Sequence, residues 1–130
     1  MAEEQAVKTR ISRELAASRK LARELARRAH DRYCTEIVAL EMTGMSPVAM
    51  HFVIATGTSD QQIRAVAREM EEAGAGLGFK VYGRAGMQQG RWVVLDFVDV
   101  VVHLFDAEFR RFYDLELLWG DAPRLRWQRR

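Results

Sequence analysis

Apolar residues recur every three or four positions along the first 30 residues, which is the spacing of one helical face. Arg and Glu occupy many of the remaining positions. The spacing predicts a helix over residues 5–29 whose apolar stripe packs on the rest of the domain, with a surface for a partner helix as the alternative. The stripe consists of Val7, Ile11, Leu15, Ser18, Ala22, Leu25 and Ala29.

Two apolar runs with turn-forming residues between them follow this helix. Residues 35–43 (TEIVALEMT) and 50–56 (MHFVIAT) predict two β-strands, and Gly44 to Pro47 predicts the turn that joins them. The second run is almost continuously apolar. Such a run indicates a strand in a sheet that is covered on both faces.

A second helix is predicted directly after the 50–56 strand. Gly57 and Thr58 lead into Ser59, and either hydroxyl side chain can cap the first turn of a helix. Glycines at 74, 76 and 78 predict where this helix ends. Its core-facing stripe is formed by Ile63, Val66, Ala67 and Met70.

The second half of the chain predicts three more strands and a final helical region. Residues 79–82 (FKVY) form a short strand, 83–90 a loop, and 91–97 and 99–105 two strong strands with a tight turn at Val98. Residues 106–118 predict one helix or two short helical pieces. Because short β-to-β connections require antiparallel neighbours, we expect a single α/β domain. Its mixed sheet has about five strands flanked by helices, in a nucleotidyltransferase-like topology, plus the N-terminal helix.

Composition agrees with one soluble domain. The chain has 130 residues, of which 48% are hydrophobic and 29% charged, and no run approaches the roughly 20 apolar residues of a membrane span. The N-terminus lacks the apolar segment of a secretory signal, and Glu3 and Glu4 argue against a transit peptide. Cys34 is the only cysteine, so no intrachain disulfide can form, and we expect it to be a buried structural residue. These features favour a cytoplasmic protein.

Charge is distributed unevenly along the chain. Residues 1–32, an N-terminal basic helix, carry nine Lys or Arg and five Asp or Glu, whereas residues 124–130, an Arg-rich tail, carry four Arg and no acid. The domain between them, residues 33–123, carries seven basic and thirteen acidic residues, a net charge of −6. An acidic body favours a basic protein partner over nucleic acid. The basic ends could contact RNA phosphate or be solvated, and both alternatives stay open.

The sequence offers little for catalysis. The Gly57-Thr58-Ser59 turn resembles the way nucleotide-transferring folds present backbone N–H groups to phosphate, which makes a nucleotidyl-transfer enzyme the rival hypothesis. However, the lysine of a phosphate-binding loop is absent. Asp96 and Asp99 flank a turn three residues apart and are expected to cap or pair locally, and His103 is expected to be a hydrogen-bonded structural residue. We therefore predict no catalytic residue, metal ligand or cofactor.

Two tryptophans at the ends of predicted elements favour a protein interface. Trp92 follows Arg91 at a strand start, and Trp119 lies in an acidic C-terminal segment. Tryptophans in such places are common anchors of protein interfaces, although each could instead pack on its own domain. The aromatic residues do not alternate with arginines along one strand pair, as a stacking platform for nucleic acid would require.

Two blocks of residues resemble the ribosomal silencing factor family, also called the Iojap-like family. The first block runs from His51 to Ser59 (HFVIATGTS) and continues at Gln62 and residues 65–67. The resemblance covers about residues 20–123. The second block comprises Gly90 to Asp96, Asp99 to His103, Arg111-Phe112-Tyr113, Leu115-Glu116, Leu118-Trp119 and Asp121-Ala122-Pro123.

Membership of this family would imply a non-catalytic protein of the cytoplasm or an organelle that binds the large ribosomal subunit. The family contacts a basic, universal large-subunit protein (uL type) where the small subunit docks, which blocks subunit joining and lowers translation when nutrients are short. A homodimer off the ribosome is a further expectation. The partner-binding residues implied by the match are Trp92, Asp96, Asp99 and His103, followed by Glu116, Trp119 and Asp121.

The sequence departs from the family pattern at two places that bear on the structure. The family usually has an acidic residue and a tyrosine before the Phe-Val-Ile run, where this chain has Met50 and His51. It usually has Gly-Asp before the triple valine, where this chain has Val98 and Asp99. Valine makes that turn stiffer than glycine would.

Overall fold

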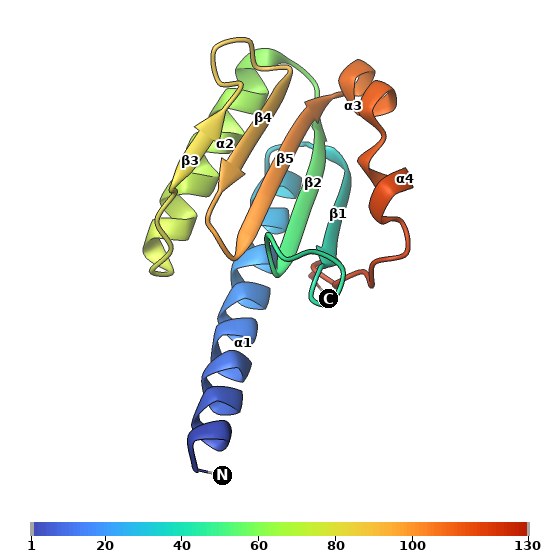
Figure 1. Cartoon of the computed structure of the whole chain (residues 1–130). Coiled ribbons are helices and arrows are strands. Elements are labelled where there is room, and N and C mark those ends of the chain that lie inside the picture. Colours follow the sequence, from blue (N-terminus) through green and yellow to red (C-terminus); the bar gives the residue numbers. More distant parts are fainter. Residues whose placement is uncertain (1, 130) are drawn as a thin grey trace.

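The protein is built around one mixed sheet of five strands in the order β1-β2-β5-β4-β3 (Figure 1). The computed structural model describes residues 2–129, apart from the side chains of Glu116 and Leu118. This architecture confirms the predicted fold class. The elements are α1 (Ala2–Asp31), β1 (Thr35–Glu41), β2 (His51–Gly57), α2 (Asp60–Gly76), β3 (Gly83–Ala85), β4 (Trp92–Asp96), β5 (Val100–Asp106), α3 (Ala107–Tyr113) and α4 (Leu115–Trp119).

The centre of the sheet is a parallel pair of buried strands. β2 pairs with β5 over seven residues, from His51 opposite Val100 to Gly57 opposite Asp106. β1 joins β2, β4 joins β5 and β3 joins β4, all antiparallel. Every residue of β2 is buried, which confirms the prediction that this strand is covered on both faces.

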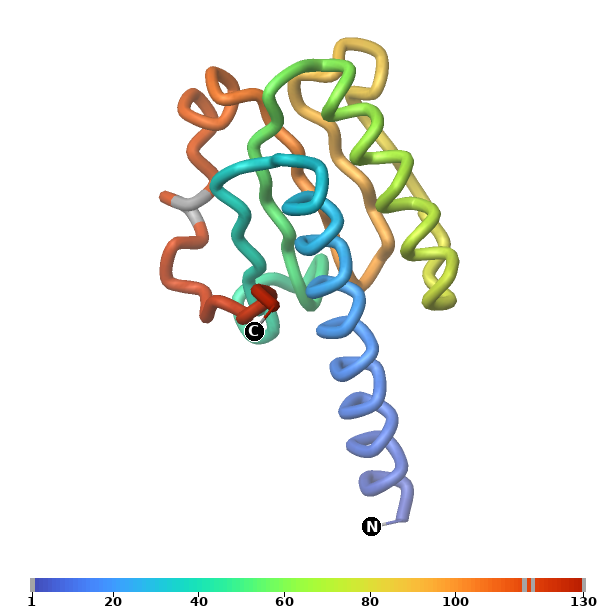
Figure 2. The backbone as a smooth tube through the Cα atoms, turned by 180° about the vertical axis from the view of Figure 1, so that it is seen from behind, coloured from blue at the N-terminus to red at the C-terminus, as the bar shows by residue number. Residues whose placement is uncertain are grey.

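Helices cover the two faces of the sheet unequally. α1 and α2, with 30 and 17 residues, lie side by side over one face, whereas α3 and α4, with seven and five residues, lie over the other (Figures 1 and 2). Alternate residues of β5 divide between two cores: Val102 and Leu104 pack under α1 and α2, and Val101 and Phe105 under α3 and α4. The face below the two short helices is therefore the less completely covered one.

The prediction of a strand at residues 79–82 is wrong. Residues 79–82 lie outside any strand, and the edge strand β3 is instead Gly83–Ala85, within the stretch predicted as a loop. Gly83 pairs with Asp96 and Ala85 with Val94, and all three β3 residues are exposed. Phe79 and Val81 are partly buried against the core under α2. The apolar residues of the FKVY run therefore pack the segment that connects α2 to β3 against the core. The strand itself is defined by backbone pairing with β4.

The C-terminal segment packs on the domain. Leu125 and Trp127 are 7% and 8% exposed and belong to the core under α1. The Leu125 N–H donates to the Ala39 carbonyl at 2.8 Å, and Arg124 bridges Leu40, so the segment runs along the outer edge of β1. An edge strand that is covered in this way is protected from pairing with other chains.

The N-terminal half of α1 extends beyond the sheet (Figure 1). The prediction that the apolar stripe packs on the domain is confirmed from Ser18 onward, where Leu21, Ala22 and Leu25 are fully buried. Val7 and Ile11, on the same stripe, remain 43% and 49% exposed. Within residues 2–129, no helix has the length and apolar character required to cross a bilayer.

Two histidines are buried in the domain. His51, fully buried, lies with its Nδ1 2.6 Å from the Ser18 hydroxyl, and its Nε2 has no hydrogen-bond partner among the described residues. His103, 9% exposed, accepts a hydrogen bond at Nδ1 from the Trp92 indole N–H at 3.2 Å. Burial lowers the pKa of His51 and lowers the pKa of His103 to about 4, so both rings are neutral at pH 7.

We predict that Gly86→Ala destabilises the domain far more than Gly78→Ala. Both glycines have φ values near +80°, which cost an alanine about 1–2 kcal/mol. A Cβ at Gly86 would also lie 1.9 Å from the Trp92 carbonyl oxygen, whereas a Cβ at Gly78 meets nothing within 4 Å. Urea unfolding should give a loss of at least about 3 kcal/mol for Gly86→Ala and about 1 kcal/mol for the control. Equal losses would contradict the close approach of residue 86 to β4.

We also predict that the free energy of unfolding decreases between pH 6.5 and about 4. The folded chain binds a proton on His103 only near pH 4, whereas an unfolded histidine titrates at 6.5. The unfolded state therefore binds protons first as the pH falls, which costs about 3 kcal/mol of stability over this interval. His51 contributes in the same direction. The variant His103→Gln keeps an acceptor for Trp92, and its free energy of unfolding in urea should depend less on pH. An unchanged pH dependence would contradict the assignment of this effect to His103.

Candidate functional site

An aromatic cluster lies on the sheet face below α3 and α4. The Trp92 ring stacks on Phe105 with centroids 5.1 Å apart, and the Tyr113 ring lies 4.5 Å from Trp92. Phe52 links this group to α4, because its ring contacts His103 at 5.4 Å and meets Trp119 edge-on at 4.9 Å. We call this set the aromatic face; its rings are Phe52, Trp92, His103, Phe105, Phe109, Phe112, Tyr113 and Trp119. We include Leu117, an exposed residue of the same short helix as Trp119.

Strand register explains why these rings meet. Trp92 pairs with Phe105 and Val94 with His103 across β4 and β5, so alternate side chains of both strands reach the same side of the sheet. The hydrogen bond from Trp92 to Nδ1 places the proton of neutral His103 on Nε2. His103 is therefore a hydrogen-bonded structural residue at the base of this face.

A charged group fixes the start of α3 over the cluster. Asp106 caps α3 by accepting the Phe109 N–H at 2.7 Å through Oδ1, and its Oδ2 accepts Arg91 Nε at 2.7 Å. The guanidinium carbon of Arg91 lies 4.1 Å from the Phe109 ring centroid. These contacts join the beginning of β4, the end of β5 and the first turn of α3.

Arg110 attaches α3 to the far side of the sheet. It is 7% exposed and donates to the Glu36 carbonyl and, at 2.9 Å, to the Thr56 hydroxyl. A buried guanidinium is tolerated only where such acceptors are present. Arg110 therefore acts as a structural anchor that holds the short helix in place.

Three exposed apolar side chains lie on α3 and α4. Phe112 and Leu117 are 80% and 82% exposed, and Tyr113 is 43% exposed. Asp114, with φ +42°, separates the two helices, so of the two alternatives predicted for residues 106–118 the structure has the two short helical pieces. Phe112 and Tyr113, with neighbours on α3, also border a hollow of about 580 Å³. Large exposed apolar groups that gather in this way are typical of interaction sites.

The structure brings together only some of the residues expected at the partner surface. Trp92, His103 and Trp119 belong to the aromatic face. Asp121 is exposed directly after α4, and Glu116 lies in α4 with a side chain outside the described residues. Asp96 is at the opposite end of β4 from Trp92, about 13 Å along the strand.

Asp96 and Asp99 shape the turn between β4 and β5. Asp96 accepts the Val98 N–H at 2.7 Å, which confirms the expected local capping role, and Val98 itself has φ +74°. The Asp99 carbonyl accepts the N–H groups of Met50 and His51. Burial, together with the negative charge of Glu14, raises the pKa of the Asp99 carboxyl group.

The Gly57-Thr58-Ser59 turn, which motivated the nucleotidyl-transfer hypothesis, forms hydrogen bonds with side chains of its own segment. The Ser59 hydroxyl accepts the Gln62 N–H at 3.0 Å, and the Gln62 side chain accepts the Thr58 N–H. In the part of the chain that the structure describes, no three His, Cys, Asp or Glu residues gather as metal ligands. Cys34 is 6% exposed, as expected, and burial raises its thiol pKa to about 11. No observation at this turn supports nucleotide chemistry.

Phe112, Tyr113 and Leu117 were not among the residues predicted from the sequence for the partner surface. Arg111-Phe112-Tyr113 stands within the second family block, so one signal for these residues was present. Leu117 follows the break at Asp114, so a continuous helix would have turned its side chain in a different direction. From the sequence, two helical pieces were one of two alternatives for residues 106–118, and the position of the break was not predicted.

The chain matches the family model described as "Ribosomal silencing factor during starvation" over residues 15–130. Among curated proteins, it is 45% identical over 93 residues to ribosomal silencing factor RsfS of Bacillus subtilis, covering 72% of this chain and 79% of the relative. It is 35% identical over 105 residues to the chloroplastic protein Iojap of Arabidopsis thaliana, covering 78% of this chain and 42% of the relative.

Two solved structures share the fold. A Chromobacterium violaceum crystal structure has a TM-score of 0.71 and 31% identity, covering 83% of this chain and 85% of that one. A Bacillus halodurans crystal structure has a TM-score of 0.68 and 36% identity, covering 79% and 94%. The family match spans most of the described domain, including the packed C-terminal segment, and the chain therefore belongs to the ribosomal silencing factor family.

Proposed function

We propose that this protein binds a basic protein of the large ribosomal subunit through its aromatic face. Bound where the small subunit docks, a domain of this size excludes the small subunit sterically and so represses translation under starvation or in stationary phase. The proposal requires no catalysis and no cofactor. The observation that carries it is the exposure of Phe112 and Leu117 beside the partly buried Trp92 and Trp119 in a member of a silencing family.

The aromatic face has the composition of a protein-binding surface. Aromatic anchors at its base are held by neighbouring rings, while Phe112 and Leu117 remain free to be buried by a partner. Interfaces concentrate their binding free energy in a few such aromatic and aliphatic residues. Trp92, His103 and Trp119 would form the centre of the contact, and Asp121 and Glu116 would lie close to it along the chain.

Charge supports a basic partner. Residues 33–123 carry a net charge of −6, and exposed carboxylates such as Asp121 attract a positively charged surface and accelerate the encounter. Asp96 and Asp99, at the other end of β4 and β5, would then act through longer-range attraction or at the rim of the contact. The basic ends of the chain would add a peripheral contact to rRNA phosphate. Off the ribosome, the same apolar surface could pair two copies in a homodimer.

We predict that the double variant Phe112→Ala with Leu117→Ala weakens binding to large subunits by about 1–3 kcal/mol, which is tenfold or more. Both side chains are at least 80% exposed, so the fold should change by less than about 0.5 kcal/mol. Binding is measured by co-sedimentation with purified subunits over a concentration series.

The matched control is Tyr82→Ala with Val48→Ala. This pair also removes one aromatic and one aliphatic side chain, 72% and 69% exposed, from sites away from α3 and α4. The control should sediment like the unmodified protein. Equal binding of both double variants would remove the aromatic face from the contact, and unmodified protein that stays with small subunits or in the supernatant would refute the proposal.

We predict that Asp121→Lys slows association with the large subunit about three- to tenfold at low ionic strength, because it reverses a charge near the contact. The difference should shrink at high salt, where the Debye length shortens to a few ångströms. Glu72→Lys on α2 makes the same charge change on the opposite side of the sheet and serves as the control. Stopped-flow mixing measures both rates; identical slowing would indicate a net-charge effect without a local contact.

A further inference from the structure

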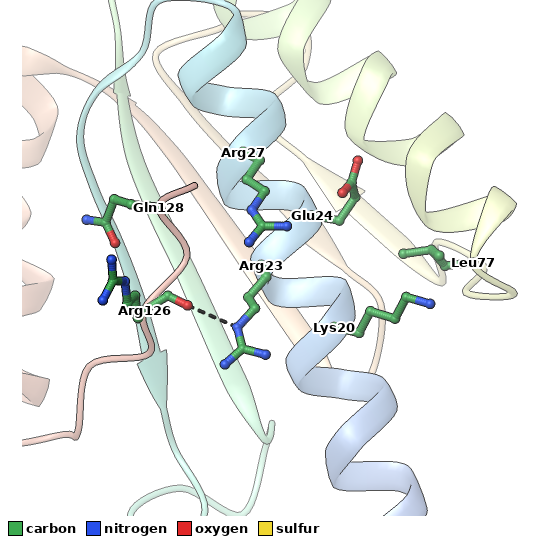
Figure 3. Close-up of a pocket in the computed structure, with 7 residues that line it drawn as sticks. All are labelled: Lys20, Arg23, Glu24, Arg27, Leu77, Arg126 and Gln128. Atoms are coloured by element: carbon green, nitrogen blue, oxygen red, sulfur yellow. Dashed lines mark hydrogen bonds between the residues drawn. The ribbon is translucent and has the colours of Figure 1, made fainter. Parts of the chain in front are cut away.

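A basic hollow lies on the side of the sheet opposite the aromatic face. It has a volume of about 570 Å³ and lies between α1, the residue after α2 and the C-terminal segment (Figure 3). Three of its cations are on α1, and the fourth comes from the other end of the chain. These cations are Lys20, Arg23, Arg27 and Arg126.

The four cations of the hollow have no acidic partner among the described residues. Glu24, the one carboxylate at the rim, pairs with Arg28 at 3.0 Å. Arginines just outside the hollow are neutralised locally: Arg19 lies 3.3 Å from Glu41 and Arg129 lies 2.8 Å from Asp31. The hollow therefore concentrates positive charge that the fold itself leaves uncompensated, and an anion placed there would be attracted by all four groups.

Two of these cations are fixed in place before any ligand arrives. Arg23 Nε donates to the Arg126 carbonyl at 3.0 Å, and Arg27 Nε donates to the Trp127 carbonyl at 2.7 Å. These bonds use only the Nε hydrogens, so the terminal nitrogens of each guanidinium keep donors for a ligand. Figure 3 shows Arg23 and Arg27 between the side chain of Arg126 on one side and that of Lys20 on the other. Fixed guanidinium groups lose little entropy when they bind an anion.

From this geometry we propose that the hollow binds the phosphodiester backbone of RNA. Guanidinium groups match phosphate oxygens, and residues 20, 23 and 27 extend over about 10 Å of helix, more than a single phosphate occupies. Leu77 is the one apolar residue among those lining the hollow. The hollow therefore lacks the aromatic and aliphatic anchors of a protein interface. The inference deepens the proposed rRNA contact and rests on that part of the proposed function. The contact is thereby assigned to one hollow formed by α1 and the C-terminal segment, and not to two separate basic ends of the chain.

The test is titration of a short, fluorescently labelled RNA hairpin with the full chain, followed by anisotropy at several salt concentrations. Four phosphate contacts predict a log–log salt dependence with a slope of roughly −3. The variant Lys20→Gln with Arg126→Gln should weaken binding about tenfold and reduce the magnitude of the slope by about 2. Neither side chain supports the fold through an ion pair within the described part of the chain.

The control variant is Arg68→Gln with Lys80→Gln, which removes the same two charges from exposed positions outside the hollow. It should bind RNA within about threefold of the unmodified protein, because only general attraction is lost. Equal weakening by both variants would overturn the proposal. So would saturable binding of tripolyphosphate at the hollow by a protein that does not bind the hairpin, because the site would then take a small polyanion.

Failure of this inference is distinguishable from failure of the proposed function. The hollow and the aromatic face lie on opposite sides of the sheet, so the Lys20 and Arg126 variant keeps Phe112 and Leu117 unchanged. Co-sedimentation with large subunits reports on the aromatic face, whereas the isolated hairpin reports on the hollow. Loss of hairpin binding with retained sedimentation supports the hollow, and unchanged hairpin binding refutes it whatever the sedimentation result.

Discussion

The parallel pairing of β2 with β5 is the constraint on which the rest of this structure depends. Parallel neighbours cannot be joined by a tight turn, so the chain leaves the end of β2 and returns through α2, β3 and β4 before it forms β5. Both central strands are buried along nearly their whole length, and each face of the sheet must therefore be covered by other elements. The two faces meet this requirement with very different amounts of helix, so the face below α3 and α4 is the less completely covered one.

The face below α3 and α4 is covered by only twelve helical residues in two pieces. Polar contacts hold α3 over the sheet: the Asp106 cap joined to Arg91 at one end, and Arg110 reaching to β1 and β2. α4 instead packs on the sheet through Leu115 and Trp119. Because the helices are so short, rings from β4 and β5 complete the cover, and Trp92 remains half-buried. The incomplete cover leaves Phe112 and Leu117 exposed above rings that pack on one another.

Patterns of local origin were predicted well from the sequence, whereas features that depend on distant pairing were not. The buried β2 strand, the Ser59 cap and the buried Cys34 followed from the residues themselves. The edge strand at 83–85 did not, because it is defined by backbone bonds to β4 and not by its own exposed side chains. Of the residues that the family resemblance implied for the partner surface, Trp92, His103 and Trp119 come together in one group of rings. Asp99 lies at the other end of β5, a separation that only the register establishes.

The positive charge at the two ends of the chain shows most clearly what folding adds. In the sequence, residues 1–32 and 124–130 are separate basic segments, each with a net charge of +4. In the fold, Leu125 and Trp127 enter the core beside α1, which brings Arg126 to the same hollow as Arg23 and Arg27. Burial of apolar groups thus offsets the repulsion between like charges, while hydrogen bonds to two C-terminal carbonyls orient the guanidinium groups. The result is a molecule with an apolar, acid-flanked surface on one side and a basic one on the other, so that contacts of opposite chemistry need not compete for the same residues.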